Sequence, residues 1–323
     1  MASMKYFYEL TVSSSPHAHG RLTTQKVMAD VLIALAPALI ASIYLFGVRA
    51  LLVTVVSAAA CVFFEWAYRK LMKLDSTVYD LSAVVTGVLL AFVCPVTVPI
   101  WCIIIGDFFA IVVVKQLFGG IGKNFMNPAL AARAFMFSWP VIMSSGFQNA
   151  KWVDAVTEAT PLAAMHQHTM PADSLMDAFL GTVGGCIGET SAALLLLGGA
   201  YLLLRRIISI RIPLAYLGTV ALIAFVFPMG NDRLMWTGMQ LCSGGLMLGA
   251  FFMATDYVTS PVTRWGQVIF GIGCGVITMV IRYFGGYNEG VSYAILIMNT
   301  CVVLLDKVGR PKKYGSSKKE AKA

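Results

Sequence analysis

Long apolar runs, separated by short polar intervals, dominate the chain. Runs long enough, or nearly long enough, to cross a membrane as helices fall at residues 27–46, 49–67, 79–96, 98–118, 127–144, 183–204, 212–228, 237–254, 265–284 and 291–307. Prolines interrupt the third to fifth runs, at Pro95, Pro99 and Pro128, which favours broken helices there. The pattern therefore predicts an all-α polytopic membrane protein with about ten transmembrane helices.

Composition supports this class. The chain is 58% hydrophobic and 12% charged, with a mean hydropathy of +0.77, whereas soluble domains carry about 25% charged residues. Its net charge of +8 could suggest a nucleic-acid partner, but basic residues gather in the tail from Lys307 to Lys322. A basic tail beside a hydrophobic run is typical of a topology signal, so we predict contact with membrane lipid and no nucleic-acid partner.

The distribution of positive charge predicts an orientation. If the N-terminus is cytoplasmic, only Arg49, Lys151, Arg233 and Arg282 fall outside, and Arg133 falls within a span. Every other lysine and arginine then lies on the cytoplasmic side, as the positive-inside rule requires. We therefore predict that both termini are cytoplasmic and that the loop 145–182 is extracytoplasmic.

The two halves of the chain resemble each other. "TGVLLAFVCPVTVP", which ends at Pro99, matches "LGAFFMATDYVTSP", which ends at Pro261, with an offset of 162. "LFGGIGKN" similarly matches "YFGGYNEG" with an offset of 166. Because each repeat holds an odd number of spans, five, we predict two inverted five-helix repeats. The predicted divisions are a cytoplasmic segment, first repeat, extracytoplasmic loop, second repeat and basic cytoplasmic tail, at 1–26, 27–144, 145–182, 183–307 and 308–323.

Acidic residues within or beside the spans are candidates for an ion path, because a charge there costs roughly 3 kcal/mol. These candidates are Asp107, Glu189 and Asp256. Each would coordinate a cation or relay a proton. The alternatives are a structural pair with an arginine such as Arg133, contact with a partner subunit or, for Asp256, a short surface loop. Glu65, near a span end, is expected to reach the membrane interface.

Motifs for a self-contained enzyme are missing. The sequence has no phosphate-binding loop, no dinucleotide-binding glycine motif and no zinc-protease motif. Two His-x-His pairs lack further ligands, so no metal site is predicted. No nucleophile and base stand at a recognisable spacing, so no catalytic residue is predicted. The chain is typical of a conduit or scaffold unless a cofactor is added.

Several segments carry a family resemblance. They are "SSSPHAHGRLTTQKVMADVLIALAPALIASI" near the N-terminus, "KQLFGGIGKNFMNPALAARAFMF" at 115–137, "GCIGETS" at 185–191 and "FMATDYVTSP" at 252–261. They resemble the D subunit of the Rnf complex, the ion-translocating ferredoxin:NAD⁺ oxidoreductase. A sister family, the B subunit of the Na⁺-translocating NADH:quinone reductase, shares the internal motifs but usually has a longer N-terminal segment.

This resemblance implies a membrane subunit of a redox-driven Na⁺ or H⁺ pump in a prokaryotic cytoplasmic membrane. The implied partners are other Rnf subunits, including a second flavinylated subunit and iron–sulfur subunits. Three alternatives stay open: a B-type subunit of the sister enzyme, an inverted-repeat transporter or channel without a redox role, and a structural scaffold. Carboxylates and hydroxyls serve both cations, so the sequence does not choose between Na⁺ and H⁺.

The resemblance also implies a covalent flavin. Family members carry FMN joined through its phosphate to a threonine, which a flavin transferase attaches at a motif like D-x-x-(S/T)-G-A-T. In "VDAVTEATPL", Asp154 and Thr157 match the motif, Thr160 matches the flavin-bearing threonine, and Glu158 replaces the usual glycine. The alternative to a flavin attachment site is a turn, or a helix N-cap at Thr157 or Thr160.

A noncovalent riboflavin is the second implied cofactor. By the same resemblance its contacts are the amides of Asn124 and Asn127, with Phe118 and Phe125 positioned to stack on the ring. The alternative is that both asparagines cap a helix that begins near Pro128.

Overall fold

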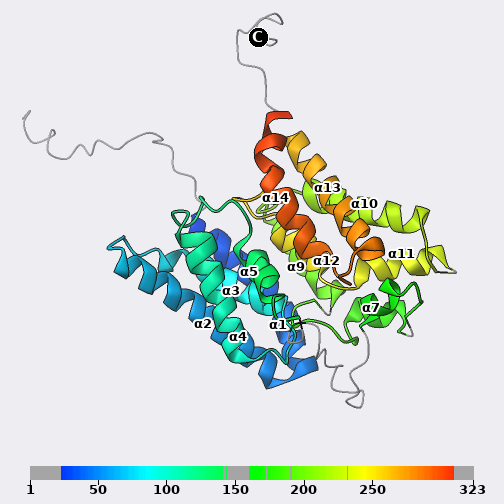
Figure 1. The fold of residues 1–323 in the computed structure, drawn as a ribbon, viewed down its shortest axis with the longest axis horizontal. Helices are drawn as coiled ribbons and strands as arrows, with labels where there is room; N and C mark the ends of the chain where they lie inside the picture. Colours follow the sequence, from blue (N-terminus) through cyan, green and yellow to red (C-terminus); the bar gives the residue numbers. More distant parts are fainter. Residues whose placement is uncertain are drawn as a thin grey trace, which may run out of the picture.

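The structure is a computed structural model that describes residues 23–140, 143, 160–171, 173–189, 191–230 and 232–308. Within these ranges the chain is helical and forms no β-strand. In Figure 1 the N-terminal helices, coloured blue to teal, form one side of the molecule, and the C-terminal helices, coloured green to red, form the other. The predicted all-α class is therefore confirmed.

The first side contains α1 (Thr24–Phe46), α2 (Val48–Leu71), α3 (Ser82–Phe92), α4 (Ile100–Phe108) and α5 (Pro128–Met136). Two short helices follow, α7 (Pro161–His166) and α8 (Leu175–Leu180). The second side contains α9 (Ala192–Leu204), α10 (Arg211–Val226), α11 (Arg233–Cys242), α12 (Leu246–Leu248), α13 (Arg264–Phe284) and α14 (Val291–Val308). A 3₁₀ turn, η2 (Val78–Asp80), precedes α3, and the π-helices η3 (Phe109–Gln116) and η4 (Gly249–Met253) continue α4 and α12.

Four of the described helices are long and apolar enough to cross a membrane: α1, α2, α13 and α14. They contain 23, 24, 21 and 18 residues, which at 1.5 Å per residue gives lengths of about 27–36 Å. The apolar helices α3, α9 and α10 are shorter. Large hydrophobic side chains remain exposed on these helices, including Ile40, Leu52, Phe63, Leu214, Leu222 and Val280, as expected for surfaces that meet lipid or another subunit.

Two predicted spans are interrupted. The span predicted at 183–204 is helical only from Ala192, because its first residues, rich in glycine, bind the end of α3 instead. The N–H groups of Ile187 and Gly188 donate to the carbonyls of Cys94 (3.1 Å) and Phe92 (2.9 Å). These bonds satisfy carbonyls that a helix leaves free at its C-terminus.

The span predicted at 237–254 is also broken, between α11 and α12. Gly244 adopts a φ of +70° there, a conformation that glycine reaches without steric penalty. The chain turns at this point, and the short α12–η4 segment runs into the interior with no exposed residue.

Close backbone contact joins the two sides of the molecule. Gly198 of α9 lies so near α1 that an added Cβ would be 2.2 Å from the Ala34 carbonyl oxygen. On the second side, an added Cβ at Gly271 or Gly275 of α13 would lie 2.7 Å from a side-chain carbon of α10. Small residues at such crossings let backbones approach, the usual basis of helix association in membranes.

Substitution of Gly198 tests the α1–α9 crossing. We expect Gly198→Ala to destabilise the protein by about 1–3 kcal/mol, because the new methyl group overlaps a backbone oxygen that cannot move independently. Gly218→Ala is the control: it lies in α10 with nothing within 4 Å of the added Cβ, and alanine is the better helix former. Thermal unfolding in detergent measures both, and equal melting temperatures would contradict the close packing.

Candidate functional site

Two cavities lie among the central helices. The first, the Arg133 cavity, has a volume of about 180 Å³. Its wall includes Val93, Arg133, Thr160, Glu189, Ser243 and Glu289. The second, the Asp256 cavity, has a volume of about 100 Å³. Its wall includes Ser82, Thr86, Lys115, Asn124, Asn127 and Asp256.

Three short helical segments run from one cavity to the other. Helix α5 begins in the Asp256 cavity at Asn127 and reaches the Arg133 cavity with Arg133. Helix α3 contributes to the second cavity near its start and to the first just beyond its end, and α12–η4 also connects the two. Between the cavities, Leu90, Ala91 and Phe92 of α3 have no exposed surface, so buried apolar side chains separate the two cavities.

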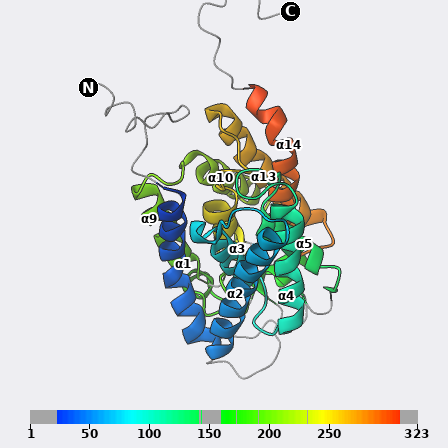
Figure 2. The same cartoon turned by 90° about the vertical axis from the view of Figure 1, so that its left-hand side faces the viewer.

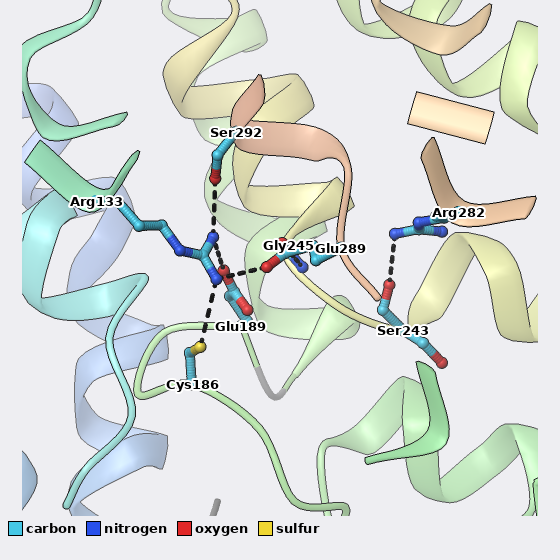
Figure 3. Close-up of polar contacts among 8 residues, drawn as sticks. All are labelled: Arg133, Cys186, Glu189, Ser243, Gly245, Arg282, Glu289 and Ser292. Atoms are coloured by element: carbon cyan, nitrogen blue, oxygen red, sulfur yellow. Dashed lines mark hydrogen bonds and ion pairs between the residues drawn. The ribbon is translucent and has the colours of Figure 1, made fainter. Parts of the chain in front are cut away.

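A buried arginine organises the first cavity (Figure 3). Arg133 donates through Nη1 to Glu189 Oε1 (3.2 Å) and to Ser292 Oγ (3.0 Å). Through Nη2 it donates to Glu289 Oε2 (2.5 Å) and approaches Cys186 Sγ (3.8 Å). The arginine–glutamate pair that the sequence left as an alternative role for Glu189 is therefore present.

Two carboxylates share this one guanidinium. An added Cβ on Gly245 would lie 2.4 Å from Glu189 Oε1 and 2.5 Å from Glu289 Oε1. The two oxygens therefore approach the same point, which only glycine leaves open, and the Gly245 N–H donates to Glu289 Oε1 (2.9 Å). Carboxylates held this close repel each other unless a proton or cation is shared between them.

Arg282, the second buried arginine of the region, binds carbonyl oxygens. It donates to the backbone (2.6 Å) and side-chain (2.9 Å) oxygens of Gln240 and to the Ser243 carbonyl (3.2 Å). These oxygens hold the Arg282 guanidinium in the interior at the last turn of α13, near the end of the span predicted at 265–284. A ring nitrogen of His166 lies 3.0 Å from the Arg282 carbonyl and so fastens α7 to α13.

Thr160 begins α7 and faces the Arg133 cavity. Its hydroxyl accepts from the Ala163 N–H (3.3 Å), and Pro161 follows at the first helical position. The N-cap that the sequence offered as an alternative is thus formed, while the same residue lines the cavity. Asp154, Thr157 and Glu158 lie outside the described residues.

The candidate riboflavin residues divide into two groups. Asn127 caps α5, since its Oδ1 accepts from Ala129 N (3.1 Å) and Leu130 N (3.3 Å) while its Nδ2 donates to the Met253 carbonyl (3.3 Å). Asn124, which donates to the Met126 carbonyl (3.2 Å), also lines the Asp256 cavity.

The two candidate stacking residues form a separate aromatic pair. The rings of Phe118 and Phe125 have centroids 4.8 Å apart, and both side chains are exposed. The structure therefore brings the asparagines together at the cavity and pairs the phenylalanines with each other at the surface.

The three acidic candidates occupy different surroundings. Glu189 and Asp256 line the two cavities, and Asp256 accepts from the Thr259 hydroxyl (3.1 Å). Asp107 contacts Ser57 and is buried between α2 and α4.

Two features of the site were not predicted from the sequence. Glu65 does not reach the interface as predicted, because Lys115 Nζ (2.7 Å) and Thr77 Oγ1 (2.6 Å) hold it in the interior. The sequence did not predict Glu289 as a site residue. Its only sequence signal is its position in "YFGGYNEG", the counterpart of "LFGGIGKN". Among the residues described, no group of three or more His, Cys, Asp or Glu side chains could hold a metal ion.

Known proteins match this chain over nearly its whole length. The model of the NQR2, RnfD, RnfE family matches residues 11–315. The chain belongs to this family. It is 50% identical over 320 residues to the D subunit of the Na⁺-translocating ferredoxin:NAD⁺ oxidoreductase complex of Acetobacterium woodii, and the match covers 97% of this chain and 98% of the relative.

Other relatives agree. The chain is 41% identical to the D subunit of the proton-translocating ferredoxin:NAD⁺ oxidoreductase complex of Clostridium ljungdahlii, with 95% of this chain and 96% of the relative covered. It is 38% identical to the D subunit of the ion-translocating oxidoreductase complex of Stutzerimonas stutzeri, with coverage of 91% and 93%. The resemblance to the Rnf D subunit read from the motifs is confirmed.

Removal of the Arg133 charge tests the buried cluster. We expect Arg133→Met to destabilise the protein by about 3–5 kcal/mol, because two buried carboxylates lose their common partner. Arg205→Met is the control, since Arg205 pairs with Asp30 (3.0 Å) while its side chain is 53% exposed; there the loss should be smaller, because solvent screens the exposed guanidinium and Asp30 keeps the hydrogen bond from Tyr201 (2.9 Å). Adding Glu289→Gln to Arg133→Met should restore part of the melting temperature, and no rescue would contradict the shared pairing.

Proposed function

We propose that this chain is a membrane subunit of an ion-translocating oxidoreductase complex of the ferredoxin:NAD⁺ type, which couples electron transfer to transport of Na⁺ or H⁺. The observation that carries the proposal is the sequence identity to the D subunits of such complexes, 50% and 41%, which extends over nearly the full length of the chain. One of these relatives is named for Na⁺ and the other for protons, so the shared chemistry is transport of a small monovalent cation. The other subunits of the complex, among them iron–sulfur subunits and a second flavinylated subunit, are its proposed partners.

The proposed ten-span architecture is two inverted five-helix repeats. Reciprocal contacts between α5 and α14 support it. Arg133 of α5 donates to Ser292 at the start of α14 (3.0 Å), while Asn299 of α14, with its amide oxygen toward α5, accepts from the Asn127 N–H at the start of α5 (3.1 Å). Arg133 and Asn299 are 166 positions apart, the same offset as the two Phe-Gly-Gly segments.

In the proposed orientation the Asp256 cavity faces the cytoplasm and the Arg133 cavity faces outward. Val27 and Met28, in the first turns of α1, line the Asp256 cavity. The start of α1 and the end of α14 lie toward the same end of the molecule (Figure 2). The positive-inside rule assigns this end to the cytoplasm, since the basic tail follows α14.

FMN esterified through its phosphate to Thr160 is the proposed redox group. Three features of the Arg133 cavity fit a flavin: the Thr160 hydroxyl at its wall, the Phe137 and Tyr287 rings beside it (centroids 5.8 Å apart), and Arg133 Nε, which is buried without a hydrogen-bond partner. The volume of about 180 Å³ is below the roughly 300–1,000 Å³ of typical ligand pockets, so the cavity would enclose one part of the flavin.

Within this proposal the side chains position and the flavin supplies the electron transfer. Thr160 fixes the attachment point at the start of α7, and the His166 contact holds that helix against α13. The Arg133 guanidinium provides positive charge in a dry site, where it favours negative charge on a neighbouring group. Asp154 and Thr157 are the proposed recognition residues for the flavin transferase.

Riboflavin is proposed to bind at the Asp256 cavity. Asn124 lines this cavity and offers an amide for the ring edge. Asn127 lines it as well, although its side chain also caps α5. The volume of about 100 Å³ implies that a neighbouring subunit or Phe118 and Phe125 at the surface would complete the site.

The proposed ion path joins the two cavities. Asp256 and Glu189 provide a carboxylate at either end, and Asp107 is the third acidic candidate. The segments between the cavities are short and broken, as are the helices that line ion and substrate sites in inverted-repeat transporters. This arrangement would also suit an inverted-repeat transporter without a redox role, so attachment of the flavin is the property that separates the two functions.

Flavin attachment can be tested on a denaturing gel. After co-expression with the flavin transferase, we expect a fluorescent band under ultraviolet light that Thr160→Ala abolishes, because the phosphoester needs that hydroxyl. Thr169→Ala, which removes a threonine hydroxyl of the same predicted loop outside the motif, is the matched control and should keep the band. A wild-type protein without fluorescence would favour the transporter or scaffold.

Ion transport can be measured separately from electron transfer in proteoliposomes that contain the intact complex. We expect Glu189→Gln and Asp256→Asn to lower the charge moved per electron, because each removes a carboxylate from a cavity wall. Asp75→Asn, in an exposed loop, is the control and should transport normally. Unchanged transport in Glu189→Gln, Asp256→Asn and Asp107→Asn would remove these acids from the path.

A further inference from the structure

Asp107 is a buried acid that lies outside both cavities. It is fully buried where α4 packs against α2 and α3. Its Oδ1 lies 2.7 Å from Ser57 Oγ and 3.2 Å from Cys61 Sγ. Its Oδ2 is buried without any hydrogen-bond partner. A carboxylate that leaves one oxygen unpaired in a dry interior is strongly disfavoured in its charged form.

The hydrogens around Asp107 can be counted. Ser57 has one hydroxyl hydrogen, yet its Oγ lies 2.8 Å from the Gly87 carbonyl oxygen and 2.7 Å from Asp107 Oδ1. With an ionised Asp107, both neighbours would be acceptors and only one of the two contacts could be a hydrogen bond. With a hydrogen on Oδ1, Asp107 donates to Ser57 and Ser57 donates to Gly87, so each short contact contains one hydrogen.

No positive charge compensates Asp107 among its contacts in the described residues. The lysine on the continuation of its own helix, Lys115, donates instead to Glu65 (2.7 Å) and to the Ser82 hydroxyl (2.8 Å). The charges of Glu65 on α2 and Lys115 on η3 therefore neutralise each other about two helical turns away. This pairing leaves the neutral acid as the form of Asp107 that the surroundings stabilise.

The packing around Asp107 has room for a proton and not for a metal cation. Asp107, Ser57 and Cys61 have no exposed surface. An added Cβ on Gly87 would lie 2.7 Å from the Ala58 backbone, so α2 and α3 are already in contact. A water needs a cavity of roughly 10–15 Å³ and a hard metal cation needs several oxygen ligands, whereas a thiol occupies one side of Asp107.

We propose that Asp107 is a proton-binding site, held as a neutral carboxylic acid by Ser57 and separate from the two cavities of the proposed cation path. The inference deepens the proposed function, because a protonatable group inside an ion-translocating subunit can couple a proton to the transport cycle. Its geometric basis is independent of the flavin on Thr160.

A polar stripe on α2 gives this proton a route. Ser57, Cys61 and Glu65 recur every fourth residue and so share one face of the helix. Glu65 in turn accepts from the Thr77 hydroxyl (2.6 Å), in the loop after α2. On the far side of Ser57, the Thr54 hydroxyl donates to the Ala50 carbonyl (2.8 Å) and no acidic group follows on α2. The stripe therefore connects Asp107 only to the proposed cytoplasmic end. The titratable groups along this route are Cys61, Glu65 and its partner Lys115.

Infrared spectroscopy of the purified, intact complex tests the proposal. The spectrum of wild type minus Asp107→Asn at neutral pH should contain the carbonyl-stretch band of a protonated carboxylic acid, shifted to lower frequency in ²H₂O. Asp75→Asn, which replaces an exposed aspartate, is the matched control and should remove no such band. A difference spectrum that contains only carboxylate bands would overturn the proposal.

Further variants keep the test decisive. Ser57→Ala removes the hydrogen-bond partner while the acid remains, so the band should shift to higher frequency; this variant serves if Asp107→Asn fails to assemble. Cys61→Ala should slow the hydrogen–deuterium exchange of the Asp107 proton, seen as the shift of its band in ²H₂O, because it interrupts the stripe.

The choice of cation separates a proton site from a sodium site. The band should be equal in Na⁺ and K⁺ buffers, and its loss on addition of Na⁺ would make Asp107 a sodium ligand and refute the proposal. None of these readouts depends on flavin attachment at Thr160.

Discussion

The pairing of one buried arginine with two glutamates is the interaction on which the centre of this protein depends. Arg133 stands on a short helix of the first half, whereas Glu189, Glu289 and Ser292 belong to segments of the second half. In a membrane interior none of these charges could remain alone, because an unpaired buried charge costs several kcal/mol. The cluster therefore fixes how the halves meet, and it also creates the polar wall that Thr160 faces.

The same constraint explains why the central helices can be short. Each break leaves backbone groups without helical partners, and in this protein other segments supply them. The carbonyls at the end of α3 accept from Ile187 and Gly188, and the first turn of α5 is capped by Asn127. Residues at and beside these breaks line the two cavities, whereas α2 and α13 are unbroken and long enough to cross a membrane.

Much of the fold was predictable because its strongest signal is local. Apolar runs predicted helices that the structure begins within a few residues of the expected position, as in α1, α2, α13 and α14. The prediction of continuous helix over 183–204 and 237–254 was wrong, because hydrophobicity does not report which backbone groups are taken by a distant segment. Glu65 was predicted at the interface for the same reason, because its buried partner Lys115 comes from another helix.

The sequence by itself determined the membrane class, the family and the identity of the candidate residues, since these depend on composition and on short ordered motifs. Only the tertiary structure decided which of them meet. It placed Thr160 at the Arg133 cavity, it placed Asn124 and Asp256 at the wall of a second cavity, it brought Glu289 beside Glu189, and it buried Asp107 beside Ser57. The physical reason is that charge and hydrogen-bond satisfaction in a dry interior is a property of neighbours in space, whereas a sequence records only neighbours along the chain.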